Sequence, residues 1–296
     1  MRPKDTRPDP MPASNRPAAF DHAAVDRVAF DHAAIAVRDR MDAALGAFAR
    51  MGFVLTPRGH HTLGSINHLI VLGTTYVELI GFPSGQADVR PELRDAPIGL
   101  NGLVLRSVDA DATHAAAQAR GAPVTAVQSF SRPVDAGGVS RDARFRTVRT
   151  APGASPSGRL YFCEHLTPEL VWRPEWQDHP NGALELVGAQ VRVTDVAAEA
   201  ALYRALLGAG AVADVADGFD VTVPPVTIAV RAGAQPAMTG LTLQVSALHR
   251  VREWLVRNGV GCTRDGDAVV VPPHEAFGVS FRFGPASAAP AGSATP

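Results

Sequence analysis

Alternating hydrophobic and polar positions recur along the chain, and each time a helix-like spacing of apolar residues follows. In the first unit, the alternating stretch VAFDHAAIAV precedes an amphipathic stretch at 40–52 that ends at Gly52. Each unit then continues with further short strand patterns. The opening strands are expected at residues 28–37, 99–108, 183–193 and 237–246. This order predicts an α+β protein made of four βαβββ modules.

The number of modules predicts two domains. A chain of 296 residues with 46% hydrophobic residues contains enough apolar material for two cores. Pairing consecutive modules gives a first domain at 28–182 and a second at 183–286. The proline-rich segment 1–27 is expected to be disordered or to form an arm outside the fold. The low-complexity segment 287–296 is expected to be a disordered tail.

Charge and composition exclude several classes of protein. The net charge is −1, and neither a nucleic-acid binder nor a membrane-surface binder is expected without a basic excess. No apolar run approaches the roughly 20 residues of a membrane span, and no signal-peptide core is evident. The two cysteines, Cys163 and Cys262, cannot form a disulfide framework or a CxxC zinc site. We therefore expect a cytoplasmic protein, and the abundance of arginine and alanine is typical of a high-GC bacterial genome.

Two strand patterns carry polar side chains that should face a shared interior. Alternation places Phe30, His32 and Ala34 on one face of the first strand. In TYVELIGF, Glu78 shares a face with apolar neighbours, and a buried carboxylate needs a metal, a cation or a hydrogen-bond donor. His32 and Glu78 are therefore candidate ligands for a divalent metal such as Fe, Mn, Ni or Zn. The alternative is that the two side chains only hydrogen-bond each other.

The stretches around these residues resemble one known superfamily. FDHAAIAVRD resembles the opening strand of the vicinal oxygen chelate superfamily, where a histidine points into a barrel cup. TYVELIGF resembles its closing strand, where a glutamate points into the same cup, and CEHLTPELVWR is similar to its glyoxalase-like branch. The resemblance spans residues 28–183 and is topological beyond them. It implies two paired glyoxalase/dihydroxybiphenyl dioxygenase-like domains with His32 and Glu78 as metal ligands.

In that superfamily the second module supplies the remaining ligands. Aligning the opening strands through their junctions with the helices puts Gly102 opposite His32, and glycine has no side chain to donate. The strand RLYFCEHL offers Glu164 or His165 as a third ligand or as a general base. The sequence does not fix the register of this strand, so both residues stay candidates.

Four further residues are candidates for substrate binding. His61 and Asn67 lie in the glycine-containing stretch GHHTLGSINHLI, and Asn67 would hydrogen-bond a substrate carbonyl. The alternative for this stretch is a polar surface hairpin. Trp172 and Arg173 would wall the pocket and hold a carboxylate, or would instead dock the first domain onto the second.

These features predict a glyoxalase-like protein that binds a small oxygenated organic molecule in the cup of the first domain. As an enzyme it would be a divalent-metal-dependent lyase or isomerase. The first alternative is a metal-independent protein that binds or sequesters a small molecule. The second is an extradiol-type dioxygenase, which would place iron in the second pair of modules, where Gly188 and Gly240 replace histidine. A homodimer is permitted but not required, because four modules complete two cups within one chain.

Overall fold

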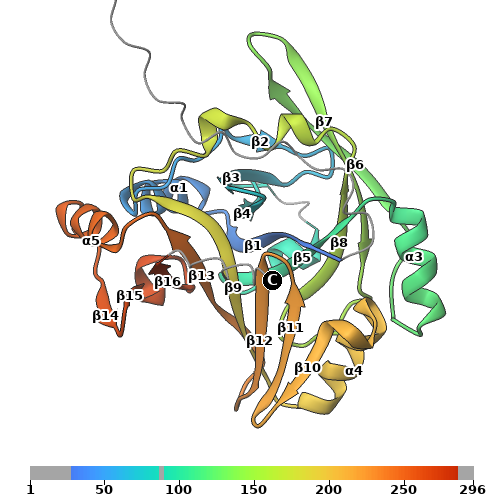
Figure 1. The fold of residues 1–296 in the computed structure, drawn as a ribbon. Coiled ribbons are helices and arrows are strands. Elements are labelled where there is room, and N and C mark those ends of the chain that lie inside the picture. Colours follow the sequence, from blue (N-terminus) through green and yellow to red (C-terminus); the bar gives the residue numbers. More distant parts are fainter. Residues whose placement is uncertain (1–27, 87–89, 286–296) are drawn as a thin grey trace, which may run out of the picture.

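The computed structural model describes residues 28–86 and 90–285, and the predicted arm at 1–27 and tail at 287–296 lie outside them (Figure 1). The described strands form two mixed eight-stranded sheets with the same arrangement. The first has the order β2-β3-β4-β1-β5-β8-β7-β6, and the second has the order β10-β11-β12-β9-β13-β16-β15-β14. The predicted α+β fold, with four modules paired into two similar sheets, is therefore confirmed.

The first sheet contains the first two modules. Its strands are β1 (Phe30–Arg38), β2 (Gly59–His60), β3 (Ile66–Leu72), β4 (Thr75–Gly81), β5 (Gly99–Ser107), β6 (Gln128–Asp135), β7 (Ser140–Arg149) and β8 (Arg159–His165). Its helices are α1 (Met41–Arg50), α2 (Pro91–Arg94) and α3 (Ala110–Ala119). The Asp109 side chain accepts hydrogen bonds from the backbone N–H groups of Asp111 and Ala112 and thereby caps α3.

The second sheet contains the other two modules. Its strands are β9 (Ala183–Val193), β10 (Val212–Val215), β11 (Gly218–Val223), β12 (Val226–Ala232), β13 (Ala237–Val245), β14 (Thr263–Asp265), β15 (Ala268–Val271) and β16 (Ser280–Pro285). Its helices are α4 (Val196–Leu207) and α5 (Leu248–Arg257). Two short 3-10 turns, Pro168–Leu170 and Pro174–Trp176, lie between β8 and β9. Among the described residues, no helix has the length and apolar character needed to cross a bilayer.

The first sheet curls until its two edges meet. The Thr62 backbone N–H donates to the Ser131 carbonyl at 2.9 Å, and the Ser131 N–H donates to the Thr62 hydroxyl at 3.2 Å. These bonds join the loop after β2 to β6, at the opposite end of the strand order. Within residues 28–86 and 90–285, no backbone hydrogen bond joins β10 to β14. The first sheet therefore encloses a cup, whereas the edges of the second sheet stay apart.

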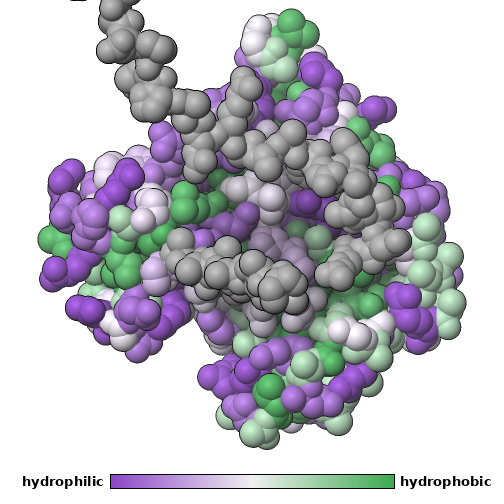
Figure 2. All heavy atoms as spheres, viewed as in Figure 1, coloured by the Kyte–Doolittle hydropathy of each residue, from purple (hydrophilic) through white to green (hydrophobic). Residues whose placement is uncertain are grey.

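One hydrophobic core joins the two sheets. Phe48 on α1 is fully buried, and its ring meets Phe281 on β16 edge-on with 5.6 Å between centroids. Phe53 stacks on Phe283 at 6.2 Å. Glu185 on β9 accepts a hydrogen bond from the Thr74 backbone N–H at 2.8 Å. The apolar faces of both sheets thus pack together, and their polar faces point elsewhere. In the view of Figure 2 the surface is a mixture of hydrophilic and hydrophobic side chains without one dominant apolar area.

Candidate functional site

Strand pairing places His32 and Glu78 on the same interior face of the first sheet. β1 and β4 run parallel, with His32 beside Tyr76 and Ala34 beside Glu78. The His32 Nε2 atom lies 3.8 Å from the Glu78 Oε2 atom, and both side chains are buried. Because side chains alternate across a strand, a histidine and a carboxylate two positions away on the neighbouring strand line one cavity.

The pairing of β5 with β8 repeats this arrangement with different residues. β1 pairs antiparallel with β5, which places Ala34 opposite Gly102. In the first module, Glu78 on β4 pairs with Ala34 on β1. In the second module, Tyr161 on β8 pairs with Val104 on β5 in the same way. Gly102 and Tyr161 are therefore the counterparts of His32 and Glu78 in the second module. The hydroxyl group of Tyr161 lies 3.4 Å from the His32 Nε2 atom.

The second sheet has no histidine or glutamate at the equivalent positions. Its pairings are Gly188 with Thr227, Gln190 with Ala229 and Thr242 with Arg282. By the same reasoning, Gly188 and Ala229 are the counterparts of His32 and Glu78. Gly240 and Arg282 are the counterparts of Gly102 and Tyr161. Arg282 forms an ion pair with Asp265. The chemical groups of the interior are therefore concentrated in the first sheet.

A cavity of about 40 Å³ lies inside the first sheet. A larger space of about 740 Å³ adjoins it, and both are lined by Arg149, Arg159 and Tyr161. The inner cavity is lined by histidine, asparagine, glutamate and arginine side chains among aromatic and aliphatic ones. These polar residues are His32, His61, Asn67, Glu78, Arg90, Arg132, Arg149 and Arg159.

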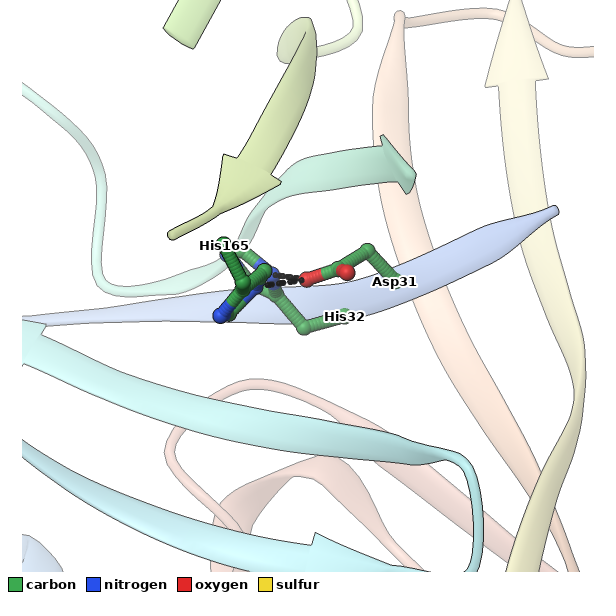
Figure 3. Close-up of side chains that lie close together, drawn as sticks. All are labelled: Asp31, His32 and His165. Atoms are coloured by element: carbon green, nitrogen blue, oxygen red, sulfur yellow. Dashed lines mark hydrogen bonds and ion pairs between the residues drawn. The ribbon is translucent and has the colours of Figure 1, made fainter. Parts of the chain in front are cut away.

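Asp31 fixes the orientation of His32 from behind (Figure 3). Its Oδ1 atom lies 2.6 Å from the His32 Nδ1 atom and 2.9 Å from the His165 Nε2 atom. Burial alone would raise the pKa of the Asp31 carboxyl, but the charges and hydrogen bonds of His165 and His32 hold this pKa well below its usual range. An ionised Asp31 accepts the Nδ1 proton of His32, so the Nε2 lone pair of His32 is directed into the cavity.

Asn67 and His61 orient Glu78 from the other side of the cavity. The Asn67 side-chain amide donates to the Glu78 Oε1 atom at 2.7 Å. The same amide lies 3.3 Å from the His61 Nε2 atom, and the His61 Nδ1 atom lies 2.9 Å from the Ser65 hydroxyl. Burial lowers the pKa of His61 to about 4, although Glu78 partly opposes the shift. His61 is therefore neutral at pH 7, and it takes part in a hydrogen-bond chain that ends on Glu78.

Comparison with known proteins agrees with this architecture. The model of the glyoxalase-like domain family matches residues 30–207, which comprise the first sheet together with β9 and α4. The chain belongs to this glyoxalase-like domain family. The resemblance to the vicinal oxygen chelate superfamily is thus confirmed. No curated protein matches the chain by sequence.

Solved structures share the fold of this glyoxalase-like protein at low sequence identity. A hypothetical protein from Staphylococcus aureus has a TM-score of 0.67 and 11% identity, over 88% of this chain and 100% of that chain. A xylose isomerase-like TIM barrel/4-hydroxyphenylpyruvate dioxygenase fusion protein has a TM-score of 0.53 and 15% identity, and the match covers 90% of this chain and 50% of that chain. A mutant of 4-hydroxymandelate synthase from Streptomyces coelicolor has a TM-score of 0.50 and 13% identity, and the match covers 88% of this chain and 94% of that chain. At such identities the likeness shows the fold alone.

The predicted catalytic residues of this glyoxalase-like protein lie in two different places. Glu164 points away from the cavity, where it accepts a hydrogen bond from the Ala110 N–H at 2.9 Å and pairs with Arg146 at 3.3 Å. These contacts hold α3 against β8. His165 points to the interior side but contacts Asp31 behind His32, and it does not line the cavity. The structure therefore brings His165, and not Glu164, to the polar cluster.

The predicted substrate-binding residues are likewise divided. His61 and Asn67 line the cavity. Trp172 packs against His165 with 4.8 Å between ring centroids and does not reach the cavity. Arg173 donates to the Asp135 carbonyl at 2.6 Å and lies over the Trp176 ring, outside the cup. Trp172 therefore supports the His165 side of the site, whereas Arg173 joins the 3-10 turns to the end of β6.

Two groups of residues are suited to hold a metal ion. Asp31, His32 and His165 each offer a ligand atom, and these atoms lie within 4.8 Å of one another. A cation there would compete with the two hydrogen bonds of Asp31. The His32 Nε2 atom and the Glu78 carboxylate face the cavity instead, and imidazole with carboxylate suits a divalent first-row metal. The carboxylate–histidine contact behind His32 is the usual support of such a ligand.

Proposed function

We propose that this protein is a glyoxalase-type enzyme, a lyase or isomerase that binds a small oxygenated organic molecule in the cup of the first sheet. The observation that carries the proposal is His32, which is oriented by the buried Asp31 and faces Glu78 across the cavity. A buried histidine and carboxylate that face one cavity, each with its own hydrogen-bond partner, are typical of a functional site.

A divalent metal held by His32 and Glu78 would act as a Lewis acid on vicinal oxygens of the substrate. The residues around these two ligands have distinct tasks. Asp31 keeps the proton of His32 on Nδ1, and Asn67 fixes the rotation of the Glu78 carboxylate. The Tyr161 hydroxyl stays protonated, because burial raises its pKa above the ordinary value, and it can donate a hydrogen bond to a substrate oxygen.

The metal content of the purified protein tests this proposal. Wild-type protein is expected to contain about one equivalent of Mn, Fe, Ni or Zn by mass spectrometry. The His32→Ala and Glu78→Ala variants should both lose the metal, whereas Glu164→Gln, outside the cavity, should keep it. Wild-type protein without metal, with unchanged stability in both alanine variants, would contradict the metal-dependent enzyme.

A second candidate is a metal-independent protein that binds or sequesters a small molecule. It is favoured by the second module, where Gly102 and Tyr161 occupy the positions that would complete a set of four ligands. Under this alternative, His32 and Glu78 would bind the ligand by hydrogen bonds alone. An extradiol-type dioxygenase has less support, because the equivalent positions of the second sheet are Gly188, Ala229, Gly240 and Arg282.

A further inference from the structure

The cup opens into a larger chamber, and arginine side chains line the boundary between the two. The inner cavity of about 40 Å³ has room for only a few atoms beside His32, whereas the adjoining chamber of about 740 Å³ has the size of a small-molecule site. Arg149, Arg159 and Tyr161 line both spaces, and we call this boundary the neck. A molecule that reaches His32 from the chamber therefore passes the guanidinium groups of the neck.

Strand pairing brings the two neck arginines to the same face of the first sheet. Arg149 on β7 pairs with Tyr161 on β8, and Arg159 precedes Tyr161 by two positions on the same strand. Because side chains alternate across a strand, all three face the interior. The Arg159 Nη2 atom lies 3.8 Å from the place that a β-carbon on Gly102 would take. This guanidinium therefore lies beside the counterpart of His32.

Arg90 adds a further guanidinium group at the neck. Its Nη1 atom lies 3.2 Å from the Glu92 Oε1 atom, and the Arg149 Nη1 atom lies 3.9 Å from the same oxygen. Two guanidinium groups from distant parts of the chain thus converge on one carboxylate. Burial lowers the pKa of Arg90, Glu92 partly opposes this shift, and the charges of Arg149 and Arg159 add to the lowering. Arg149 and Arg159 are therefore both close enough to repel Arg90.

The positive charges of the neck are only partly balanced. Glu92 is the carboxylate that Arg90 and Arg149 share, but its side chain is 40% exposed, so the ion pairs are weak. Asp95, the other carboxylate among the described residues of the chamber wall, is already bound to Arg94 by two hydrogen bonds. Within the part of the chain that the structure describes, the buried Nε and Nη1 atoms of Arg90 have no hydrogen-bond acceptor. The neck therefore has an excess of positive charge and unused donors.

We propose that the neck binds the acidic group of a small organic ligand whose body lies in the chamber. The acidic group, a carboxylate or a phosphate, takes the place of Glu92 between Arg90 and Arg149, and Arg159 adds its positive charge. Guanidinium groups bind such oxyanions through charge-assisted hydrogen bonds. The chamber wall is rich in proline and alanine, which suits an aliphatic body. This inference rests on the proposed function in that the ligand extends into the same cup, but the arginines bind the acidic group whether or not the cup holds a metal.

Matched ligands measure the charge requirement in the full-length protein. Hexanoate, hexyl phosphate and hexanamide share an aliphatic body and are compared by calorimetry and by thermal shift. We expect at least one of the two anions to bind with a Kd in the millimolar range or below, and the amide to bind at least about tenfold more weakly. The tighter of the two anions identifies the acidic group as carboxylate or phosphate. Equal binding of all three, or no binding of either anion, would overturn the inference.

Variants with opposite expected effects identify the groups that bind. Glu92 competes with the ligand, so Glu92→Gln should strengthen binding of the anion about 2- to 5-fold, the value of a weak ion pair. Arg149→Gln should weaken it about 10- to 100-fold, the value of a lost charged hydrogen bond. Arg94→Gln removes an equal charge from the same short helix, outside both spaces, and should leave the affinity unchanged. Weaker or unchanged binding in Glu92→Gln, or unchanged binding in Arg149→Gln, would overturn the inference.

Anion binding in His32→Ala separates the neck from the metal site. We expect the affinity to stay within about twofold of the wild-type value while the metal is lost, because distant sites act independently. Loss of anion binding together with the metal would place the acidic group on the metal and overturn the inference. Wild-type protein that binds the anion but contains no metal would support the neck and contradict only the proposed metal-dependent enzyme.

Discussion

The two sheets share a strand order but differ in their interiors. In the first sheet, the positions that face the cup hold His32, Glu78 and Tyr161, and the sheet edges meet through Thr62 and Ser131. In the second sheet the equivalent positions are Gly188, Ala229, Gly240 and Arg282, and the edge strands remain apart. The fold is thus maintained without the polar residues, because it depends on the opposite faces of the strands.

This difference shows how stability and function are divided between two faces of one sheet. The outer faces of both sheets and their helices form a common core that includes Phe48 and Phe281. The inner face of the first sheet contains buried charges that the core does not need. A sheet can therefore lack these polar residues and keep its packing.

Disruption of the common core should produce the largest effect. Phe48→Ala removes a fully buried ring that contacts residues of both sheets. We expect a loss of about 3–5 kcal/mol in the free energy of unfolding, the usual cost of such a truncation. Urea denaturation followed by tryptophan fluorescence and by circular dichroism should show one shared transition. Separate transitions for the two sheets, with only one shifted by the substitution, would refute the common core.

The Asp31→Asn substitution should have the next largest effect on stability, and the second sheet has no equivalent of Asp31. The substitution removes the carboxylate that His32 and His165 share. A loss on the order of 2–3 kcal/mol in stability is expected, because two histidines lose a charged acceptor in a buried place. The affinity for a divalent metal should also fall about 10- to 100-fold, as for other supporting carboxylates. Wild-type stability and metal affinity in the Asp31→Asn variant would show that His32 needs no such support.

Acid should destabilise the protein through His179, which lies between the two sheets. Its Nδ1 atom accepts the Val54 N–H at 3.0 Å, and its Nε2–H donates to the Val71 carbonyl at 2.9 Å. Burial lowers the pKa of His179, although the bond to Val71 partly opposes this. The unfolded chain therefore binds a proton at a higher pH than the folded one. The stability contributed by neutral His179 is complete above about pH 6.5 and decreases as the pH falls toward the folded-state pKa.

Denaturation curves between pH 7.5 and pH 5 measure this contribution. The slope of stability against pH should be smaller in His179→Gln than in the wild-type protein. Identical slopes would show that His179 does not contribute to the acid sensitivity.

Arg282→Gln should have the smallest effect on stability. The side chain occupies the position equivalent to Tyr161, but it forms a surface ion pair with Asp265. Such pairs contribute between zero and about 1 kcal/mol, so the expected loss is below roughly 1 kcal/mol. Tyr161→Phe, at the equivalent position of the first sheet, should by contrast alter ligand binding. A large loss in Arg282→Gln, measured by chemical denaturation, would reveal a role for the second interior.

Periodicity in the sequence predicted the modules because apolar faces alternate regularly. The expected opening strands at 28–37, 99–108, 183–193 and 237–246 correspond to β1, β5, β9 and β13. The alignment of Gly102 with His32 also agrees with the strand pairing. The short strands β2, β10 and β14 escaped the sequence analysis, and so did the longer β6, because Pro133 interrupts its pattern. A proline is tolerated there because β6 is an edge strand.

Residues of the site were missed where regular alternation fails or where strand register matters. A register shift lies between Phe30 and His32 in the pairing of β1 with β5. Phe30 therefore packs in the core, although alternation placed it beside His32, and Asp31 contacts the His32 ring. Tyr161 required the register of β8, which is set by pairing with a strand far away in the sequence. Arg132 lies on the unpredicted β6, so no local signal indicated it.

The central claim is that the function lies in the cup of the first sheet. The location of a bound metal tests this claim most directly. Crystals grown with Mn²⁺ would be measured for anomalous scattering near the manganese edge. The account predicts one strong peak within about 2.0–2.3 Å of the His32 Nε2 atom and a Glu78 carboxylate oxygen, and none at Gly188, Ala229, Gly240 or Arg282. A peak in the second sheet, or between Asp31 and His165 with none at Glu78, would contradict it.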